Sequence, residues 1–110
     1  MIDWKRVSDL HAEIGDPDFE EVVELFMEEV EGVILRLRTD PKPELYAEDL
    51  HFLKGCAANL GFVVFATLCL AAENRAARGA ADTVDLNEIF DCYASSKADF
   101  LSGVAEGLAA

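Results

Sequence analysis

Asp-Leu-His-Phe-Leu-Lys-Gly-Cys-Ala-Ala-Asn-Leu-Gly-Phe, residues 49–62, is the stretch that decides the fold. On a helical wheel its apolar side chains gather on one face, roughly opposite His51: Leu50, Leu53, Ala57 and Leu60. The outward strip around His51 carries Lys54, Gly55 and Ala58. A glycine inside a helix costs about 1 kcal/mol relative to alanine. We therefore expect Gly55 to keep a solvent-facing histidine accessible.

The pattern His51-x-x-Lys54-Gly55-x-x-x-Asn59-Leu60-Gly61 resembles the signature of histidine-containing phosphotransfer (HPt) domains. These domains are the phosphocarriers of multistep two-component phosphorelays, and the resemblance extends over roughly residues 3–104. It implies that His51 is the phosphoacceptor, that Lys54 stabilises the phosphoryl group and that Gly55 leaves space for it. It also implies that the partners are response-regulator receiver domains, a hybrid sensor histidine kinase, or both.

Length and composition restrict the class of protein. A chain of 110 residues with 52% hydrophobic residues is expected to form one domain, residues 1–110, with a proper core. The net charge of −13 argues against binding to nucleic acid or to an anionic membrane surface. The chain begins at Met1 without a signal peptide, and its longest apolar stretch, residues 60–72, is too short to span a bilayer. We expect a free-standing cytoplasmic shuttle whose three cysteines are free thiols.

Hydrophobic periodicity and capping residues predict an all-α fold. Helices are expected over residues 3–14, 16–38, 43–60, 62–78 and from 85 to about 105. Asp3, Asp16 and Asp85 are the expected N-terminal caps, with Pro17 at the first position of the second helix. Asp82 is an alternative, earlier start for the last helix. The fourth helix is apolar almost all round for three turns, which predicts burial at that end. The architecture predicted is an up-down four-helix bundle with a short additional N-terminal helix.

Two further expectations concern the core. The last helix is expected to direct one apolar face inward: Leu86, Ile89, Phe90, Tyr93, Phe100, Leu101 and Val104. Asp49 also falls on the apparent core face of the central helix. The sequence leaves two explanations for it, a position at the edge of the bundle or a pairing with a basic residue.

The chemistry expected at His51 is phosphoryl transfer without a bound nucleotide. A neutral imidazole, with a reference pKa near 6.5, offers a lone pair on one ring nitrogen. Lys54 can offset charge on the phosphoryl group. The chain has no nucleotide-binding glycine-rich motif, and no evident acidic cluster lies beside His51 to hold Mg²⁺. We therefore expect a carrier that is not an enzyme and has no cofactor of its own, with Mg²⁺ held by the partner receiver.

The docking surface is expected to cover the strip around His51 and the neighbouring face of the second helix. It includes Ala47, Ala58 and Phe62 in addition to Lys54 and Gly55. Two alternatives belong to other classes. One is a helical interaction module without phosphotransfer; the other is a metal-binding bundle, because Glu48-x-x-His51 has the spacing of di-iron sites. A second copy of that spacing is missing around His11, and His51 faces away from the apolar side.

Overall fold

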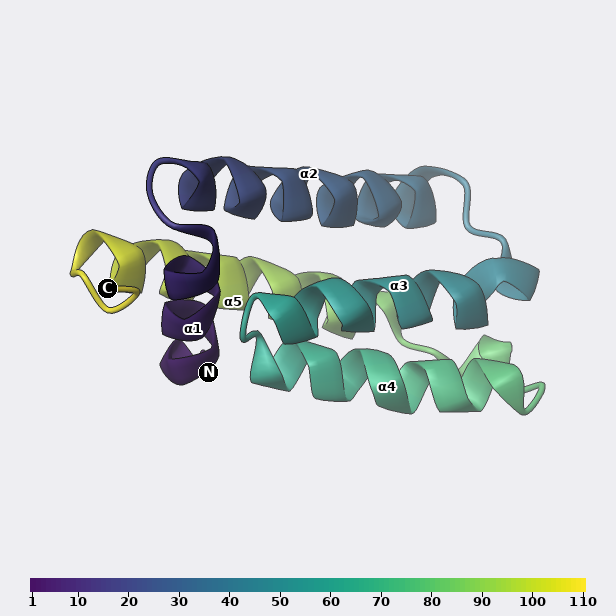
Figure 1. Ribbon diagram of the computed structural model, residues 1–110. Coiled ribbons are helices and arrows are strands. Elements are labelled where there is room, and N and C mark those ends of the chain that lie inside the picture. The colour runs from purple at the N-terminus through teal and green to yellow at the C-terminus, as the bar shows by residue number, and fades with distance from the viewer.

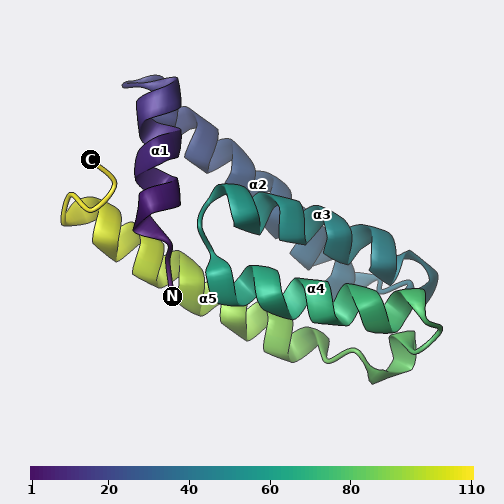
Figure 2. The same cartoon turned by 60° about the horizontal axis from the view of Figure 1, so that its bottom comes forward.

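Five α-helices form the fold, and the computed structural model describes all residues, 1–110. They are α1 (Trp4–Ile14), α2 (Asp18–Thr39), α3 (Tyr46–Asn59), α4 (Val63–Ala77) and α5 (Leu86–Ala105). Short 3-10 helices precede α3 (η1, Pro43–Leu45) and α5 (η2, Ala81–Thr83). The four longer helices run side by side and alternate in direction, while α1 crosses one end (Figures 1 and 2). The predicted up-down bundle with an additional N-terminal helix is confirmed.

Local capping signals set several helix ends where the sequence predicted them. The Asp3 carboxylate accepts a hydrogen bond from the Arg6 N–H at 3.2 Å, which caps α1. The Asp85 carboxylate accepts from the Glu88 N–H at 3.2 Å, which caps α5. Gly15, with φ of 78°, ends α1 in a backbone conformation that favours glycine.

The starts of α2 and α3 differ from the prediction. Asp16 does not cap α2, which begins at Asp18 after Pro17 and has no side-chain cap. The Asp16 carboxylate accepts instead from His11 Nε2 at 3.0 Å, so a tertiary contact removes it from the helix end. The segment after Pro43 forms the 3-10 helix η1, and the α-helical part of this region begins only at Tyr46.

One cluster of 24 buried residues makes up the core. The four apolar residues named from the wheel, three in α3 and Leu60 directly after it, are all at most 1% exposed. Two expectations for the core are wrong. Leu101 is 48% exposed because it lies at the edge of the buried face of α5. The start of α4 is only partly buried because only one side of this helix packs against the core. Val63 and Val64 are accordingly exposed, whereas Phe65 is fully buried.

The end of the sequence motif holds α1 onto the bundle. Gly61 accepts a hydrogen bond from the Asp3 N–H at 2.8 Å, and the Asn59 side chain accepts from Arg6 at 3.3 Å. A Cβ on Gly61 would lie 2.7 Å from the Asp3 carbonyl oxygen. Asn59 and Gly61 therefore contribute to the fold, whereas the first half of the motif remains at the surface.

Asp49 is paired with a basic residue, which was one of the two explanations left open. The Arg36 guanidinium of α2 donates a hydrogen bond to the Asp49 carboxylate, and this bond raises the pKa of Arg36. The Asp49 residue is 8% exposed, while the Arg36 side chain is 39% exposed. The pair joins α2 to α3, the two helices that line the groove described below.

Candidate functional site

His51 lies near the middle of α3, with its side chain 68% exposed. Its orientation follows from the helix period, because Leu50 and Leu53 on the opposite face are fully buried in the core. The burial of these leucines sets the rotation of α3 about its axis. That rotation directs the imidazole into solvent, as the sequence predicted.

One hydrogen bond orients the imidazole. His51 Nδ1 lies 3.0 Å from Glu73 Oε2 of α4. A carboxylate only accepts hydrogen bonds, so Nδ1 carries the proton and donates it. In the neutral ring the lone pair then resides on Nε2, the nitrogen directed away from Glu73. The pair therefore leaves the lone pair on Nε2, the nitrogen that does not contact Glu73.

Glu73 is the residue of this site that the sequence reasoning missed. It lies 22 residues after His51 and belongs to no motif with it. Its side chain is 22% exposed, and its other oxygen, Oε1, is buried without a hydrogen bond in the protein. The only available signal was that the chain turns back at Gly61, which makes α3 and α4 antiparallel neighbours (Figure 1).

The rest of the predicted strip lies along the same side of α3. Lys54 is half-buried and takes part in none of the ion pairs of the structure. Gly55 is exposed, and a Cβ built on it would meet no atom within 4 Å. Ala58 is exposed and Ala47 is half-buried. The strip therefore combines an imidazole, an unpaired cation and small residues.

Phe62 does not belong to this surface, so its assignment to the docking strip is wrong. Its side chain is 1% exposed and packs against Phe100, with ring centroids 5.5 Å apart. The reason is the turn at Gly61, whose φ of 73° ends the helix and directs the next residue into the core. Helical extrapolation from α3 fails at this residue because Phe62 is no longer in the helix.

A shallow groove of about 350 Å³ opens beside His51, between α2 and α3. Phe26 and Glu29 line it from α2, and Phe52 and Gly55 line it from α3. The face of α2 that was expected to border the docking surface is thus next to the imidazole. Phe52 is 40% exposed and supplies apolar contact area beside a polar site.

Neither the histidine nor the cysteines form a metal-ligand set. No group of three or more His, Cys, Asp and Glu side chains is placed to hold a metal ion, and His51 pairs with Glu73 rather than Glu48. All three cysteines are free thiols, and burial raises the pKa of Cys69 to about 12. None of the helices has the length and apolar character needed to cross a membrane.

The comparison with protein families gives one match. The family model of the Hpt domain matches residues 21–99, which is more than half of the chain. This chain belongs to the Hpt domain family. Hpt domains are histidine phosphocarriers, not enzymes, and they work with receiver domains and kinases in phosphorelays.

The matched range includes His51 and Glu73 of this Hpt domain, and it leaves α1 outside. No curated protein and no solved structure gave a significant match to the chain. The assignment of individual residues therefore depends on the geometry of the site.

Proposed function

We propose that this Hpt domain accepts a phosphoryl group on His51 from the aspartate of one receiver domain and passes it to another receiver. The observation that carries the proposal is the hydrogen bond from His51 Nδ1 to Glu73, made by an imidazole that is largely exposed. It selects one tautomer and leaves Nε2 free to react. Membership of the Hpt family supports phosphoryl transfer as the class of reaction.

In the proposed step, Nε2 attacks the phosphorus of an aspartyl phosphate. The N–P bond forms as the bond from phosphorus to the aspartyl oxygen breaks, and the aspartate carboxylate leaves with the electron pair. The imidazole then carries a positive charge, with the proton still on Nδ1. The negatively charged Glu73 carboxylate stabilises that positive charge through the 3.0 Å hydrogen bond to Nδ1. Transfer to the next receiver is the reverse of this step.

Lys54 and Gly55 act on the phosphoryl group and its approach. Lys54 follows His51 by one turn and has no ion-pair partner, so its ammonium is available to the phosphoryl oxygens. The open space at Gly55 admits the partner on the same side. The in-line geometry, and the Mg²⁺ that accompanies aspartyl phosphate, are left to the receiver domain.

The docking surface proposed here contains Ala47, Ala58 and the groove beside His51. Phe26 and Glu29 extend it onto α2, and Glu73 extends it onto α4. Phe62 is excluded by its burial. Backbone NMR shifts on adding a receiver domain should concentrate on α3 and on these flanks. Shifts confined to α5 would contradict this surface.

The test of function is transfer of label from a receiver domain. A receiver charged with radiolabelled acetyl phosphate and Mg²⁺ is mixed with the Hpt domain, and the product is treated with acid and with alkali. We expect an acid-labile, alkali-stable phosphoprotein, as expected of a phosphoramidate. His51→Gln should abolish labelling with circular dichroism unchanged, and His11→Gln should label normally. Label that persists in His51→Gln would refute the assignment, and no label from any receiver would favour an interaction module.

Glu73 gives a second test with a built-in control. Glu73→Ala removes the acceptor, whereas Glu73→Gln keeps an amide oxygen that can accept from Nδ1 but lacks the charge. One charge-assisted hydrogen bond contributes about 1.5–3 kcal/mol, and exposure of the ring favours the lower figure. We expect transfer to slow about tenfold in Glu73→Ala and less in Glu73→Gln. Equal rates in all three proteins would remove Glu73 from the mechanism.

A further inference from the structure

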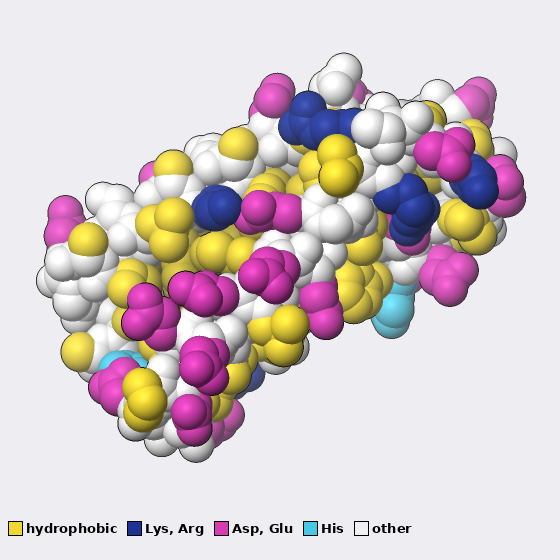
Figure 3. Space-filling model, turned by 90° about the horizontal axis from the view of Figure 1, so that it is seen from above, with side chains coloured by type: hydrophobic (Ala, Val, Ile, Leu, Met, Phe, Trp, Pro, Cys, Tyr) yellow, Lys and Arg dark blue, Asp and Glu magenta, His cyan; other side chains and the backbone are white.

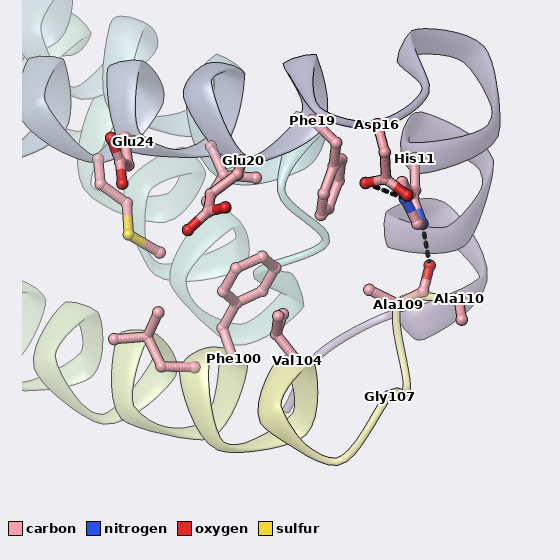
Figure 4. A pocket seen from close by; sticks show the side chains of 13 residues that line it. His11, Asp16, Phe19, Glu20, Glu24, Phe100, Val104, Gly107, Ala109 and Ala110 are labelled. Atoms are coloured by element: carbon pink, nitrogen blue, oxygen red, sulfur yellow. Dashed lines mark hydrogen bonds and ion pairs between the residues drawn. The ribbon is translucent and has the colours of Figure 1, made fainter.

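A second groove lies at the end of the bundle where α1 crosses it (Figure 4). It has a volume of about 390 Å³, within the range of roughly 300–1,000 Å³ found for ligand pockets. Eight of its 13 lining residues are hydrophobic. Val23 and Met27 of α2 face Phe100 and Val104 of α5 across it. The groove therefore presents an apolar floor between two helices.

Unpaired acids form the α2 rim of this groove. Glu20 and Glu24 line it and are exposed, and neither takes part in an ion pair or a side-chain hydrogen bond. Figure 4 shows Glu20 projecting from α2 over the space above Phe100. No Lys or Arg lines the groove, and none occurs between Arg6 and Arg36 in the sequence. No Lys or Arg side chain of the groove therefore offsets the negative charge of this rim.

The end wall of the groove is held in place by His11. Its Nδ1 donates to the Ala109 carbonyl at 3.0 Å and its Nε2 contacts Asp16 at 3.0 Å, so the C-terminal segment is fastened to α1 and the start of α2. Ala109 itself is 5% exposed. The groove is therefore bounded on three sides by ordered elements (Figure 4).

A second copy of this chain is a poor occupant because it would bring more negative charge. The chain carries 22 acids against nine Lys and Arg. Seen from the α2 side, acidic and apolar side chains alternate over the half of the molecule that contains this groove (Figure 3). Two such faces would repel each other. The occupant should instead be apolar on one side and cationic on the other.

We propose that this groove binds a cationic amphipathic helix of a partner protein. Phe19, Val23 and Met27 are spaced four residues apart and span about 12 Å along α2, enough for two or three anchor side chains of a docked helix. Lysines or arginines flanking those anchors would meet Glu20 and Glu24. Leu101, on the α5 rim and 48% exposed, would complete the apolar contact.

This surface is separate from the one around His51. The His51 groove is lined by α2 and α3, whereas this groove is lined by α2 and α5, and the two share no residue. A partner held here leaves the imidazole accessible. The groove would thus allow the Hpt domain to be tethered by one protein while it exchanges phosphate with another.

The probe is an acetylated, amidated 14-residue peptide of Leu, Lys and Ala with its leucines on one helical stripe. A peptide of the same composition with scrambled leucines, and one with Glu in place of Lys, are the ligand controls. Binding is followed by backbone NMR and by calorimetry at two salt concentrations. We expect saturable shifts at the α2 and α5 residues of the groove, none at the α3 strip, and equal affinity for His51→Gln.

Matched variants separate this site from general attraction to an acidic protein. Glu20→Gln with Glu24→Gln should weaken the peptide about fivefold or more, as expected of two exposed ion pairs. Leu101→Gln should weaken it severalfold. The control pair, Asp82→Asn in η2 with Glu88→Gln in the first turn of α5, removes the same charge far from the groove and should change affinity less than about twofold.

Several outcomes would overturn the proposal. They are equal weakening by the control pair, equal binding of the scrambled peptide, shifts spread over the whole acidic surface, and no binding at all. Analytical ultracentrifugation gives a further outcome that would overturn the proposal. A dimer of the wild-type chain that Leu101→Glu dissociates would identify the occupant of the groove as a second copy of the chain.

Discussion

Gly55 offers the sharpest separation of function from stability. It lies inside α3, is exposed, and a Cβ placed on it meets nothing within 4 Å. The fold therefore gains nothing from glycine here, whereas in the proposed function the phosphoryl group and the partner need the space one turn from His51. We expect Gly55→Ala and Gly55→Gln to fold more stably and to transfer phosphate more slowly.

The stability gain follows from helix propensity and from a less flexible unfolded chain. Replacing an exposed mid-helix glycine by alanine contributes about 0.5–1 kcal/mol. An unfolding entropy of about 2.1 cal/mol/K per residue, over 110 residues, makes that a rise in Tm of about 2–4 °C. For transfer, one methyl group should cost little, whereas the glutamine side chain should slow it by about tenfold, equivalent to 1.4 kcal/mol in the barrier.

The assay measures Tm by circular dichroism and transfer from a labelled receiver for each variant. Gly32→Ala is the stability control, because Gly32 is also an exposed helical glycine with no atom within 4 Å of a built Cβ. Ala94→Gln, exposed on α5, is the control for side-chain bulk and should transfer normally. Gly103→Ala is the opposite case. Its Cβ would lie 2.0 Å from the Trp4 ring, so we expect a loss of about 1–3 kcal/mol.

Two results would refute this reasoning. Undiminished transfer in Gly55→Gln would show that the glycine is not required for access. A loss of several kcal/mol in Gly55→Ala would show that Gly55 packs against another element, and the outward orientation of His51 would then be in doubt.

Three further predictions concern single side chains. Lys54→Ala should slow phosphoryl transfer more than Lys54→Arg. The loss of transition-state stabilisation should be smaller than the roughly 2–4 kcal/mol found in a dry site, because this strip is exposed to water. Wild-type rates in both variants would exclude an electrostatic role for Lys54. Asp49→Ala leaves the Arg36 guanidinium unpaired but partly hydrated. Urea unfolding should therefore show a loss of about 1–2 kcal/mol in the free energy of unfolding, below the roughly 3–5 kcal/mol expected when a fully buried pair is broken. An unchanged unfolding midpoint would contradict this. Hydrogen bonds to Asp16 and to the Ala109 carbonyl raise the pKa of His11 above its ordinary 6.5. The stability that protonated His11 contributes is therefore complete below pH 6.5 and is lost as pH rises through the folded-state pKa. The excess stability of wild type over His11→Gln should be larger near pH 5.5 than near pH 8.5, and a difference that is constant with pH would count against this prediction.

The helices and the face of α3 were predictable because they depend on interactions within a few residues. Asp3 and Asp85 cap helices through N–H groups three residues away. Leu50 and Leu53 direct His51 outward through the helix period alone. Where a local signal competed with a tertiary contact it failed, as at Asp16, whose carboxylate contacts His11 instead of capping α2.

The sequence by itself determined the helical bundle, the exposed histidine and the small residue one turn after it, because periodicity and propensity act along one helix. Only the tertiary structure decided what meets that histidine from outside α3. Glu73 reaches His51 because α4 packs antiparallel to α3, and Phe62 leaves the strip because the turn at Gly61 directs it inward. The same distinction separates Gly55, which borders open space, from Gly103, which contacts Trp4. Two helical glycines look alike in sequence, and their difference arises from the neighbouring helix.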